Sequence, residues 1–273
     1  MKQKLLAGAA ALTLTFSALT VSASAARMVP VTVDGTVIPA VSYLNGGVTA
    51  VPLRALLETA GGWTVRWDGG AGEARADSRD VSLTVRPGKA ALTVNGAVQT
   101  SAAPAYVDGG CTYVPLRSLC QALGWQVSWD ESLGGAAVAT GDAGTRDSGA
   151  WTEEDLYWLS RVISAESRGE SFEGQLAVGH VVLNRVASRE FPDTIQGVVF
   201  DRKDGVQFEP VSNGTIYQEP TAQAVAAAKM VLGGARSVIG SCLYFYAPAL
   251  SQGKWINANR TYYTTIGCHR FYL

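Results

Sequence analysis

The order of apolar and polar residues divides the chain into two halves with different periods. In the first half, short runs such as WTVRWD (63–68) alternate apolar and polar side chains, which predicts half-buried β-strands. In the second half, apolar residues recur every three or four positions from Leu156 to Ile163, which predicts an amphipathic helix. Residues 140–150 (TGDAGTRDSGA) lie between the halves, are small and polar, and predict a linker.

The first half contains an internal repeat, in which residues 46–69 match residues 109–131. Both segments carry the letters VPLR followed later by WD, and the match extends over most of residues 28–139. Each unit predicts a strand, a glycine-containing hairpin turn, a second strand, a short helix and a final strand. The helix of the first unit presents four apolar side chains at helical spacing, which are Leu53, Leu56, Leu57 and Ala60.

The final strand of each unit carries two tryptophans. In the first unit, Trp63, Val65 and Trp67 alternate on one face, and we expect this face to pack on the helix. Stacking of sugar rings on the tryptophans is the alternative. The VPLR…G…WD pattern resembles the copper amine oxidase N-terminal-like domain, a stalk-like module attached to many exported bacterial enzymes. The resemblance implies a binding or spacing role, and copper chemistry is not expected because this half contains no histidine.

The first 25 residues have the features of an export signal. Lys2 and Lys4 precede an uncharged, mostly apolar run, and Ala23-Ser24-Ala25 fits the small-x-small pattern of signal peptidase. We therefore expect cleavage near Ala25, secretion of the mature chain, and no membrane span in it. An uncleaved membrane anchor is the alternative, but the apolar run is marginal in length for a span.

The charge of the chain bears on its binding partners, and its four cysteines bear on possible disulfides. The net charge is −1 and only 16% of residues are charged, so a nucleic-acid partner, which would need clustered basic charge, is not expected. Cys242 and Cys268 could form a disulfide that holds the C-terminal tail, with free buried thiols as the alternative. For Cys111 and Cys120, which replace Val48 and Leu57 of the first unit, we expect buried apolar positions.

Glu166 continues the apolar series of the first predicted helix in the second half. It therefore lies on the apolar face, close to the C-terminal end of that helix. Burial and the negative end of the helix dipole both disfavour a carboxylate there, so the pKa of Glu166 should be raised, as a general acid requires. The alternative is that the helix frays and Glu166 points to water. Glu170 lies past Gly169, outside the periodic pattern.

The next segment, residues 171–188, predicts a second helix that is apolar on most sides and capped by Ser171. His180 lies within it and is expected to be a packed core histidine. The chain has only two histidines and no HxxxH pair, so no metal and no cofactor are expected. A serine triad is also poorly supported, because no G-x-S-x-G motif is present.

Motifs spread over residues 155–273 resemble the catalytic domain of the SleB/CwlJ cell-wall hydrolase family, the spore cortex-lytic enzymes. They are AESRGESFEGQLAVGHVVLNRV, FPDTIQGVVF, GVQFEPV, CLYFYAP and IGCHRFY. The resemblance implies an α-rich, lysozyme-like fold that acts on peptidoglycan, with Glu166 as the catalytic acid and Glu170 as a possible second carboxylate. It also implies a sugar-binding groove lined by Gln207, Phe208, Tyr244, Phe245 and Tyr246.

The expected fold class is therefore α+β. The chain should contain a signal peptide (1–25), a repeated β/α stalk-like domain (26–139), a linker (140–150) and a small α-rich catalytic domain (151–273). The stalk-like repeat stands where the best-known spore enzyme of the family has a different peptidoglycan-binding repeat. A spore-cortex role is therefore less firmly implied than the chemistry, and a regulatory protein partner stays unknown.

The resemblance implies cleavage of the β-1,4 bond between N-acetylmuramic acid and N-acetylglucosamine in peptidoglycan glycan strands. A lytic transglycosylase route needs one acid, whereas a hydrolase uses two carboxylates, which Glu166 and Glu170 could supply. Two other functions stay open at this point. One is an amidase acting between muramic acid and L-alanine, and the other is a non-catalytic wall-binding protein.

Overall fold

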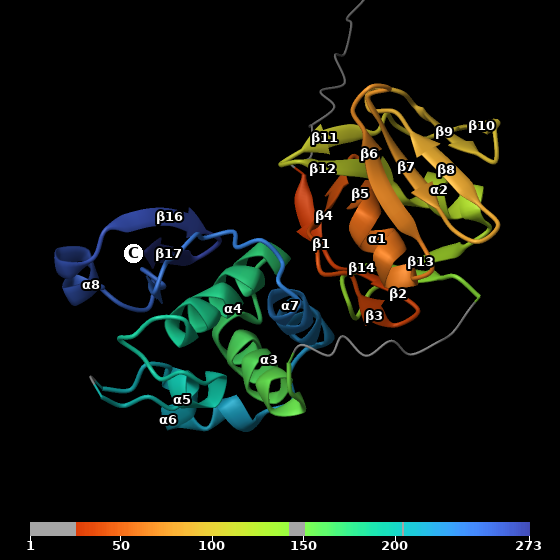
Figure 1. Ribbon diagram of the computed structural model, residues 1–273. Coiled ribbons are helices and arrows are strands. Elements are labelled where there is room, and N and C mark those ends of the chain that lie inside the picture. The colour runs from red at the N-terminus through yellow and green to blue at the C-terminus, as the bar shows by residue number, and fades with distance from the viewer. Residues whose placement is uncertain (1–25, 142–150, 204) are drawn as a thin grey trace, which may run out of the picture.

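The computed structural model describes residues 26–141, 151–203 and 205–273, which form a β-rich domain followed by a helical domain (Figure 1). This mixed architecture confirms the α+β fold class predicted from the change of period. The expected export signal and residues 142–150 of the expected linker lie outside the described residues.

Three sheets and two short helices build the N-terminal domain. Their strand orders are β1-β4-β5-β12-β11, β10-β9-β8-β7-β6 and β13-β14-β2-β3. The strands are β1 (Arg27–Val29), β2 (Val31–Val33), β3 (Thr36–Val37), β4 (Ser42–Asn45), β5 (Val48–Pro52), β6 (Thr64–Asp68), β7 (Glu73–Asp77), β8 (Ser82–Val85), β9 (Ala91–Val94), β10 (Ala97–Thr100), β11 (Tyr106–Asp108), β12 (Cys111–Pro115), β13 (Gln126–Asp130) and β14 (Gly135–Ala139). The helices are α1 (Leu53–Ala60) and α2 (Leu116–Leu123).

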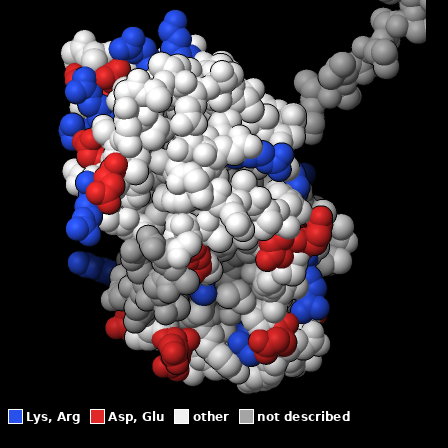
Figure 2. All heavy atoms as spheres, turned by 90° about the vertical axis from the view of Figure 1, so that its right-hand side faces the viewer, with Lys and Arg blue, Asp and Glu red and all other residues white. Residues whose placement is uncertain are grey.

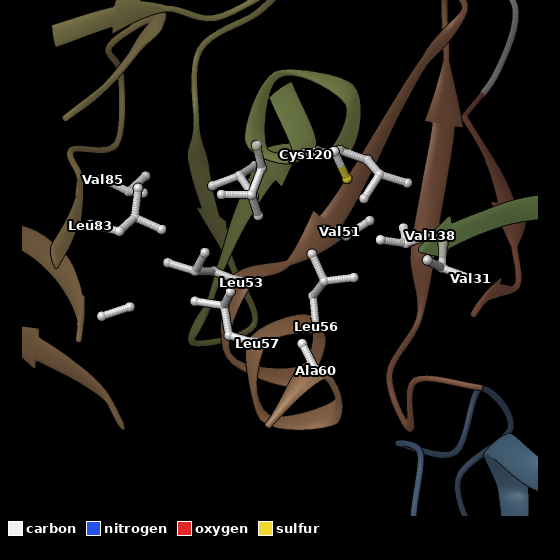
Figure 3. Packing of buried hydrophobic residues seen from close by; sticks show 14 of the residues in the cluster. Val31, Val51, Leu53, Leu56, Leu57, Ala60, Leu83, Val85, Cys120 and Val138 are labelled. Atoms are coloured by element: carbon white, nitrogen blue, oxygen red, sulfur yellow. The ribbon is translucent and has the colours of Figure 1, made fainter. Parts of the chain in front are cut away.

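The two repeats interlock and share one hydrophobic core. β5 of the first unit pairs antiparallel with β12 of the second, with Val51 opposite Val114. β14 at the end of the second unit pairs in parallel with β2 of the first. The predicted apolar face of α1 is buried against side chains from both units, including Cys120 and Val138 (Figure 3). Neither repeat therefore has a core of its own, which explains why they occur as a pair.

The hairpin turns of the repeats form as predicted, whereas the tryptophans pack only in part. Asp34-Gly35 and Asn95-Gly96 have positive φ at both positions, as tight hairpin turns require. Trp63 packs against the core, but Trp67 is 51% exposed, so the prediction that both tryptophans pack on the helix is wrong. Trp67 instead lines the cavity that lies beside the eight-residue helix α1.

All four cysteines are free. Cys120 is buried in the shared core, as predicted. Cys111 is exposed, contrary to the prediction, because it is the first residue of β12 and directly follows the tight turn of the β11–β12 hairpin. Cys242 is buried and Cys268 is exposed, and the disulfide considered between them is not formed.

Helices α3 (Glu153–Ser167), α4 (Phe172–Val186) and α7 (Ala222–Leu232) pack against one another in the helical domain. Shorter helices follow α4, namely α5 (Ile195–Val199), α6 (Glu209–Asn213) and the 3₁₀ turn η1 (Thr215–Tyr217). The sheet β15-β17-β16 and helix α8 end the chain. Their bounds are β15 (Tyr244–Tyr246), α8 (Lys254–Asn259), β16 (Tyr262–Ile266) and β17 (His269–Tyr272).

Side-chain caps fix where the main helices begin. Thr152 Oγ1 accepts a hydrogen bond from the amide of Asp155, and the Asp155 carboxylate accepts one from the amide of Thr152, which forms a capping box. Ser171 caps α4 as predicted, by accepting from the amide of Gly174. Helix α7 begins two residues after Pro220, because Thr221 and not the proline provides the cap.

The two domains contact each other through Leu133, in the turn between β13 and β14. Its side chain is buried in the hydrophobic core of the helical domain. Gln223 of α7 donates a hydrogen bond to its carbonyl oxygen and accepts one from Gln175 of α4. The corresponding position of the first repeat is Ala71, so this contact distinguishes the second repeat.

The surface of the described residues has one large cavity and a mixed charge distribution (Figure 2). A cavity of about 1330 Å³ lies where α1 and β6 face the end of α7, and Trp67 and Lys229 are among its lining residues. The molecular face in Figure 2 carries acidic and basic side chains interspersed, without a large region of one sign. Within the described residues, none of the helices combines the length and the apolar character needed to span a bilayer.

Candidate active site

Glu166 occupies the position that the periodicity predicts, in the last turn of α3. It follows Val162 and Ile163 at spacings of four and three, and both of those side chains are fully buried. The helix does not fray before Ala165, since Ser167 is still helical and its hydroxyl donates to the carbonyl of Ile163 at 2.6 Å. Glu166 itself is only partly exposed, so its carboxyl group lies at the boundary between core and solvent.

Burial is the main influence on the acidity of Glu166. It raises the pKa of this carboxyl from 4.5 to about 7, and the negative charge of Glu209 adds to the increase. The positive charge of Arg185 acts in the opposite direction. A carboxyl with a pKa near neutrality is half protonated at pH 7, so it can both donate and accept a proton.

Arg185 is a buried cation next to this carboxyl. It lies in the last turn of α4 and is 4% exposed. Its Nε donates to the carbonyl of Leu243 at 2.7 Å, and its Nη1 donates to Gln207 Oε1 at 3.4 Å. The guanidinium carbon also lies 4.8 to 5.6 Å from the ring centres of three aromatic residues, Phe191, Phe208 and Tyr244. These contacts fix a positive charge beside Glu166.

Arg185 also brings together three of the five residues predicted to line a sugar groove. Gln207 bonds to it, and Phe208 and Tyr244 lie against it. Phe208 is 1% exposed, so it supports Arg185 from the interior. Tyr244 is partly exposed, and its hydroxyl accepts a hydrogen bond from Arg260. Their roles in substrate binding stay predictions.

The other two predicted groove residues lie further along β15. Phe245 points inward and stacks on Phe271, with ring centres 5.9 Å apart. Tyr246 stacks on Tyr272, and its hydroxyl accepts a 2.9 Å hydrogen bond from Asn257 of α8. The structure therefore gives these two rings contacts within the C-terminal sheet and with α8.

Glu170 contacts a different part of the domain. Its Oε2 accepts a 3.0 Å hydrogen bond from the amide of Cys268, and its Oε1 lies 4.0 Å from Nδ1 of His269. The carboxylate is thus directed to the turn between β16 and β17. A role as second carboxylate stays a prediction, with Glu209 as the acidic residue whose charge acts on Glu166.

The two histidines are both buried. His180 is 5% exposed and its Nε2 lies 3.1 Å from the carbonyl of Ala235, which confirms the prediction of a core histidine. Burial lowers the pKa of His180 and of His269, and the charge of Glu170 partly opposes this for His269. Among the residues that the structure describes, no three His, Cys, Asp or Glu side chains are grouped as metal ligands.

Sequence reasoning missed Arg185 and Glu209. The signal for Arg185 was present, since a charged residue in a helix that is apolar on most sides needs a buried partner. Glu209 directly follows the Gln207-Phe208 pair, but its proximity to Glu166 depends on how the loop before α6 folds back onto α3, which has no sequence pattern.

Two known protein families match separate parts of the chain. The family described as Cell Wall Hydrolase matches residues 169–272, and the family described as Copper amine oxidase N-terminal domain matches residues 32–136. The first match begins three residues after Glu166, so it covers Glu170 and the aromatic strand but stops short of Glu166.

Individual relatives agree with the first of these families. A spore cortex-lytic enzyme of Bacillus cereus is 35% identical over 128 residues, which are 47% of this chain and 48% of the relative. The cell wall hydrolase CwlJ of Oceanobacillus iheyensis is 32% identical over 101 residues, which are 35% of this chain and 70% of the relative. This chain therefore spans about half the length of the spore cortex-lytic enzyme.

A solved structure is also similar in sequence to the helical domain. It is the catalytic domain of the germination-specific lytic transglycosylase SleB from Bacillus anthracis, which is 34% identical. The similarity covers 46% of this chain and 98% of that chain, with a TM-score of 0.42.

Proposed function

The chain belongs to the cell wall hydrolase family, and we propose that its helical domain cleaves the glycan strands of peptidoglycan between N-acetylmuramic acid and N-acetylglucosamine. The observation that carries this proposal is the partly buried Glu166, whose pKa is raised to about 7 beside the fixed charge of Arg185. A carboxyl in that state is suited to protonate a glycosidic oxygen at neutral pH.

We propose a lytic transglycosylase route that uses Glu166 alone. Protonated Glu166 donates its proton to the bridging oxygen, and the bond from that oxygen to C1 of the muramic acid breaks. N-acetylglucosamine leaves with a free hydroxyl, and positive charge develops at C1. The Glu166 carboxylate then takes the proton of the C6 hydroxyl, whose oxygen bonds to C1 and closes a 1,6-anhydro ring. Glu166 ends protonated again, and no water is consumed.

Arg185 supports the second half of this route. Once Glu166 has donated its proton, a carboxylate remains in a partly buried place that otherwise disfavours charge. The guanidinium of Arg185 is held by Leu243 and Gln207, so its charge is in place before the reaction starts. Such a preorganised charge stabilises the anion without any rearrangement at the moment of reaction.

The same family membership supports a proposal about location. The relatives include spore cortex-lytic enzymes, so we propose that this chain acts on the cell wall or the spore envelope after export through the signal predicted in residues 1–25. The N-terminal domain would then serve as a binding or spacing module, as its match to a stalk-type family suggests.

Product analysis tests the proposal. Purified vegetative and cortex peptidoglycan would each be digested, and the fragments identified by mass spectrometry. Anhydromuramoyl ends that disappear with Glu166→Gln are the expected result. Muramic acid with a free reducing end as the sole new terminus would indicate hydrolysis. New amino groups on the peptides would indicate an amidase, and an absence of released fragments would indicate a wall-binding protein.

A further inference from the structure

Several large apolar side chains are exposed near the C-terminus. Trp255 is 57% exposed, although tryptophan is normally highly buried. Four other large apolar residues of the same region are at least 42% exposed, namely Leu250, Tyr262, Tyr263 and Leu273. Exposed apolar area concentrated in one region of a domain commonly marks a binding surface.

Trp255 is connected to the candidate active site by a series of alternating rings and guanidinium groups. The guanidinium carbon of Arg260 lies 5.1 Å from the ring centre of Trp255 and 4.4 Å from that of Tyr244. The guanidinium carbon of Arg185, whose charge acts on Glu166, lies 5.6 Å from the centre of the same Tyr244 ring. The exposed tryptophan is therefore the outer member of a packed series that begins beside the catalytic candidate.

Helix α8, which carries Trp255, is held against the C-terminal sheet by hydrogen bonds of Asn257. Asn257 accepts a 2.7 Å hydrogen bond from the hydroxyl of Tyr272 and donates one to the hydroxyl of Tyr246. Gly253, which precedes the helix, has a φ of +55°, and a Cβ there would collide with the ring of Tyr246. These contacts hold α8 in place, so the exposed ring of Trp255 has a defined position.

We propose that Trp255 forms a sugar-binding subsite for a glycan strand, outside the sugars that flank the cleaved bond. The proposal rests on the function proposed above, since the strand that reaches Trp255 is the one held at Glu166. The C–H groups on the face of a pyranose ring pack on aromatic rings, and Trp255 offers a large exposed face for this. The rings of Tyr244 and Trp255 lie 6.0 Å apart, so a strand held along Tyr244 can extend onto Trp255. A substrate limited to the two sugars at the cleaved bond would not use this subsite.

Substrates of two lengths test this subsite. Trp255→Ala should raise KM for long glycan strands by about tenfold with kcat little changed, because it removes binding that is equal in the ground and transition states. A disaccharide, which occupies only the two sugars that flank the cleaved bond, should be cleaved as by the wild type. Trp255→Phe keeps a smaller ring and should recover most of the loss. Tyr217→Ala is the matched control, because Tyr217 is 60% exposed but packs near Trp158 on α3.

A binding measurement separates this inference from the proposed function. In the Glu166→Gln background, the affinity for solubilised long strands would be measured with and without Trp255→Ala. Weaker binding caused by Trp255→Ala supports the subsite even if the wild type releases no anhydro products. Equal binding of the two variants overturns the subsite, as does an equal loss of cleavage on long and short substrates. A wild type that binds but cleaves nothing overturns the proposed function alone.

Discussion

The amide of Cys268 donates a 3.0 Å hydrogen bond to the carboxylate of Glu170, which ties the turn between β16 and β17 to the end of helix α3. Gly267 makes this contact possible, since it has a φ of +56° and a Cβ at this position would collide with Glu170 Oε2. The second glutamate of the AESRGE motif thus holds the C-terminal sheet, which carries Tyr244, near the helix that carries Glu166.

Gly267→Ala is expected to destabilise the protein by about 2 to 3 kcal/mol, because it adds backbone strain to a steric collision. Glu170→Ala should cost about 1 to 2 kcal/mol through the lost hydrogen bond. In the double variant the collision is absent, so the total cost should be smaller than the sum. Urea unfolding of the wild type and the three variants measures this coupling, and strictly additive costs would contradict the proposed collision.

Much of this arrangement could be predicted from local patterns, and the part that could not depends on contacts between distant segments. Thr152 and Ser171 predict the starts of two helices, because an N-cap depends only on neighbouring residues. Glu166 could be assigned to an apolar face for the same reason. The hydrogen bond between Glu170 and Cys268 joins residues 98 positions apart, and no pattern in the sequence predicts it. The interlocking of the two repeats likewise depends on pairing between β5 and β12, which repeated letters do not specify.

Replacing Glu209 should change the pH dependence of the reaction. Its negative charge helps to raise the pKa of Glu166, so Glu209→Gln should lower that pKa. The protonated acid would then be lost at a lower pH, and the alkaline limb of the kcat/KM profile should move down by a fraction of a pH unit. The shift should shrink at high salt, because Glu209 is exposed and its charge is screened.

Glu154→Gln provides the matched control for this measurement. Glu154 is also an exposed carboxylate, but it lies in the first turn of α3, at the opposite end from Glu166. Its removal should leave the alkaline limb in place. If both variants shift the limb equally, the effect comes from net charge and not from the position of Glu209.

Arg185 variants should separate its charge from its hydrogen bonds. Arg185→Met removes the positive charge that lowers the pKa of Glu166, so the alkaline limb should move to higher pH while kcat falls. Arg185→Lys cannot reproduce both hydrogen bonds of the planar guanidinium, but it keeps a positive charge. The alkaline limb should therefore stay closer to that of the wild type. Profiles that are identical for the two variants would show that the charge is not the relevant feature.

Leu133→Ala should destabilise the helical domain although the residue belongs to the N-terminal repeat. The side chain is buried in the helical core, and such a truncation typically costs about 2 to 4 kcal/mol. Calorimetry should show an earlier transition that coincides with loss of activity on heating. Leu123→Ala is the control, because Leu123 packs only on the N-terminal core. An unchanged activity-linked transition in Leu133→Ala would mean that the domains unfold independently.

Burial of the ionisable carboxyl of Glu166 should reduce the stability of the fold at neutral pH. Because its pKa is raised from 4.5 to about 7, the folded protein keeps this proton at pH values where the unfolded chain has released it. Stability from this group is fully present below about pH 4.5, and it is lost as the pH rises towards 7. A change of this size corresponds to about 3 kcal/mol. Glu166→Gln mimics the neutral acid, so it should abolish cleavage and yet raise the free energy of unfolding at pH 8.

The gain should diminish as the pH falls and vanish below about pH 4.5, where both forms of residue 166 are uncharged. Urea unfolding of the wild type and Glu166→Gln at several pH values between 4 and 8 measures this difference. Glu154→Gln is again the control, since Glu154 is exposed and its substitution should give no comparable gain. A Glu166→Gln variant with the same stability advantage at every pH would contradict the raised pKa. Loss of cleavage together with a pH-dependent gain would connect the position of Glu166 on the apolar face directly to its role as the acid, because the burial that weakens the fold also holds the proton for transfer.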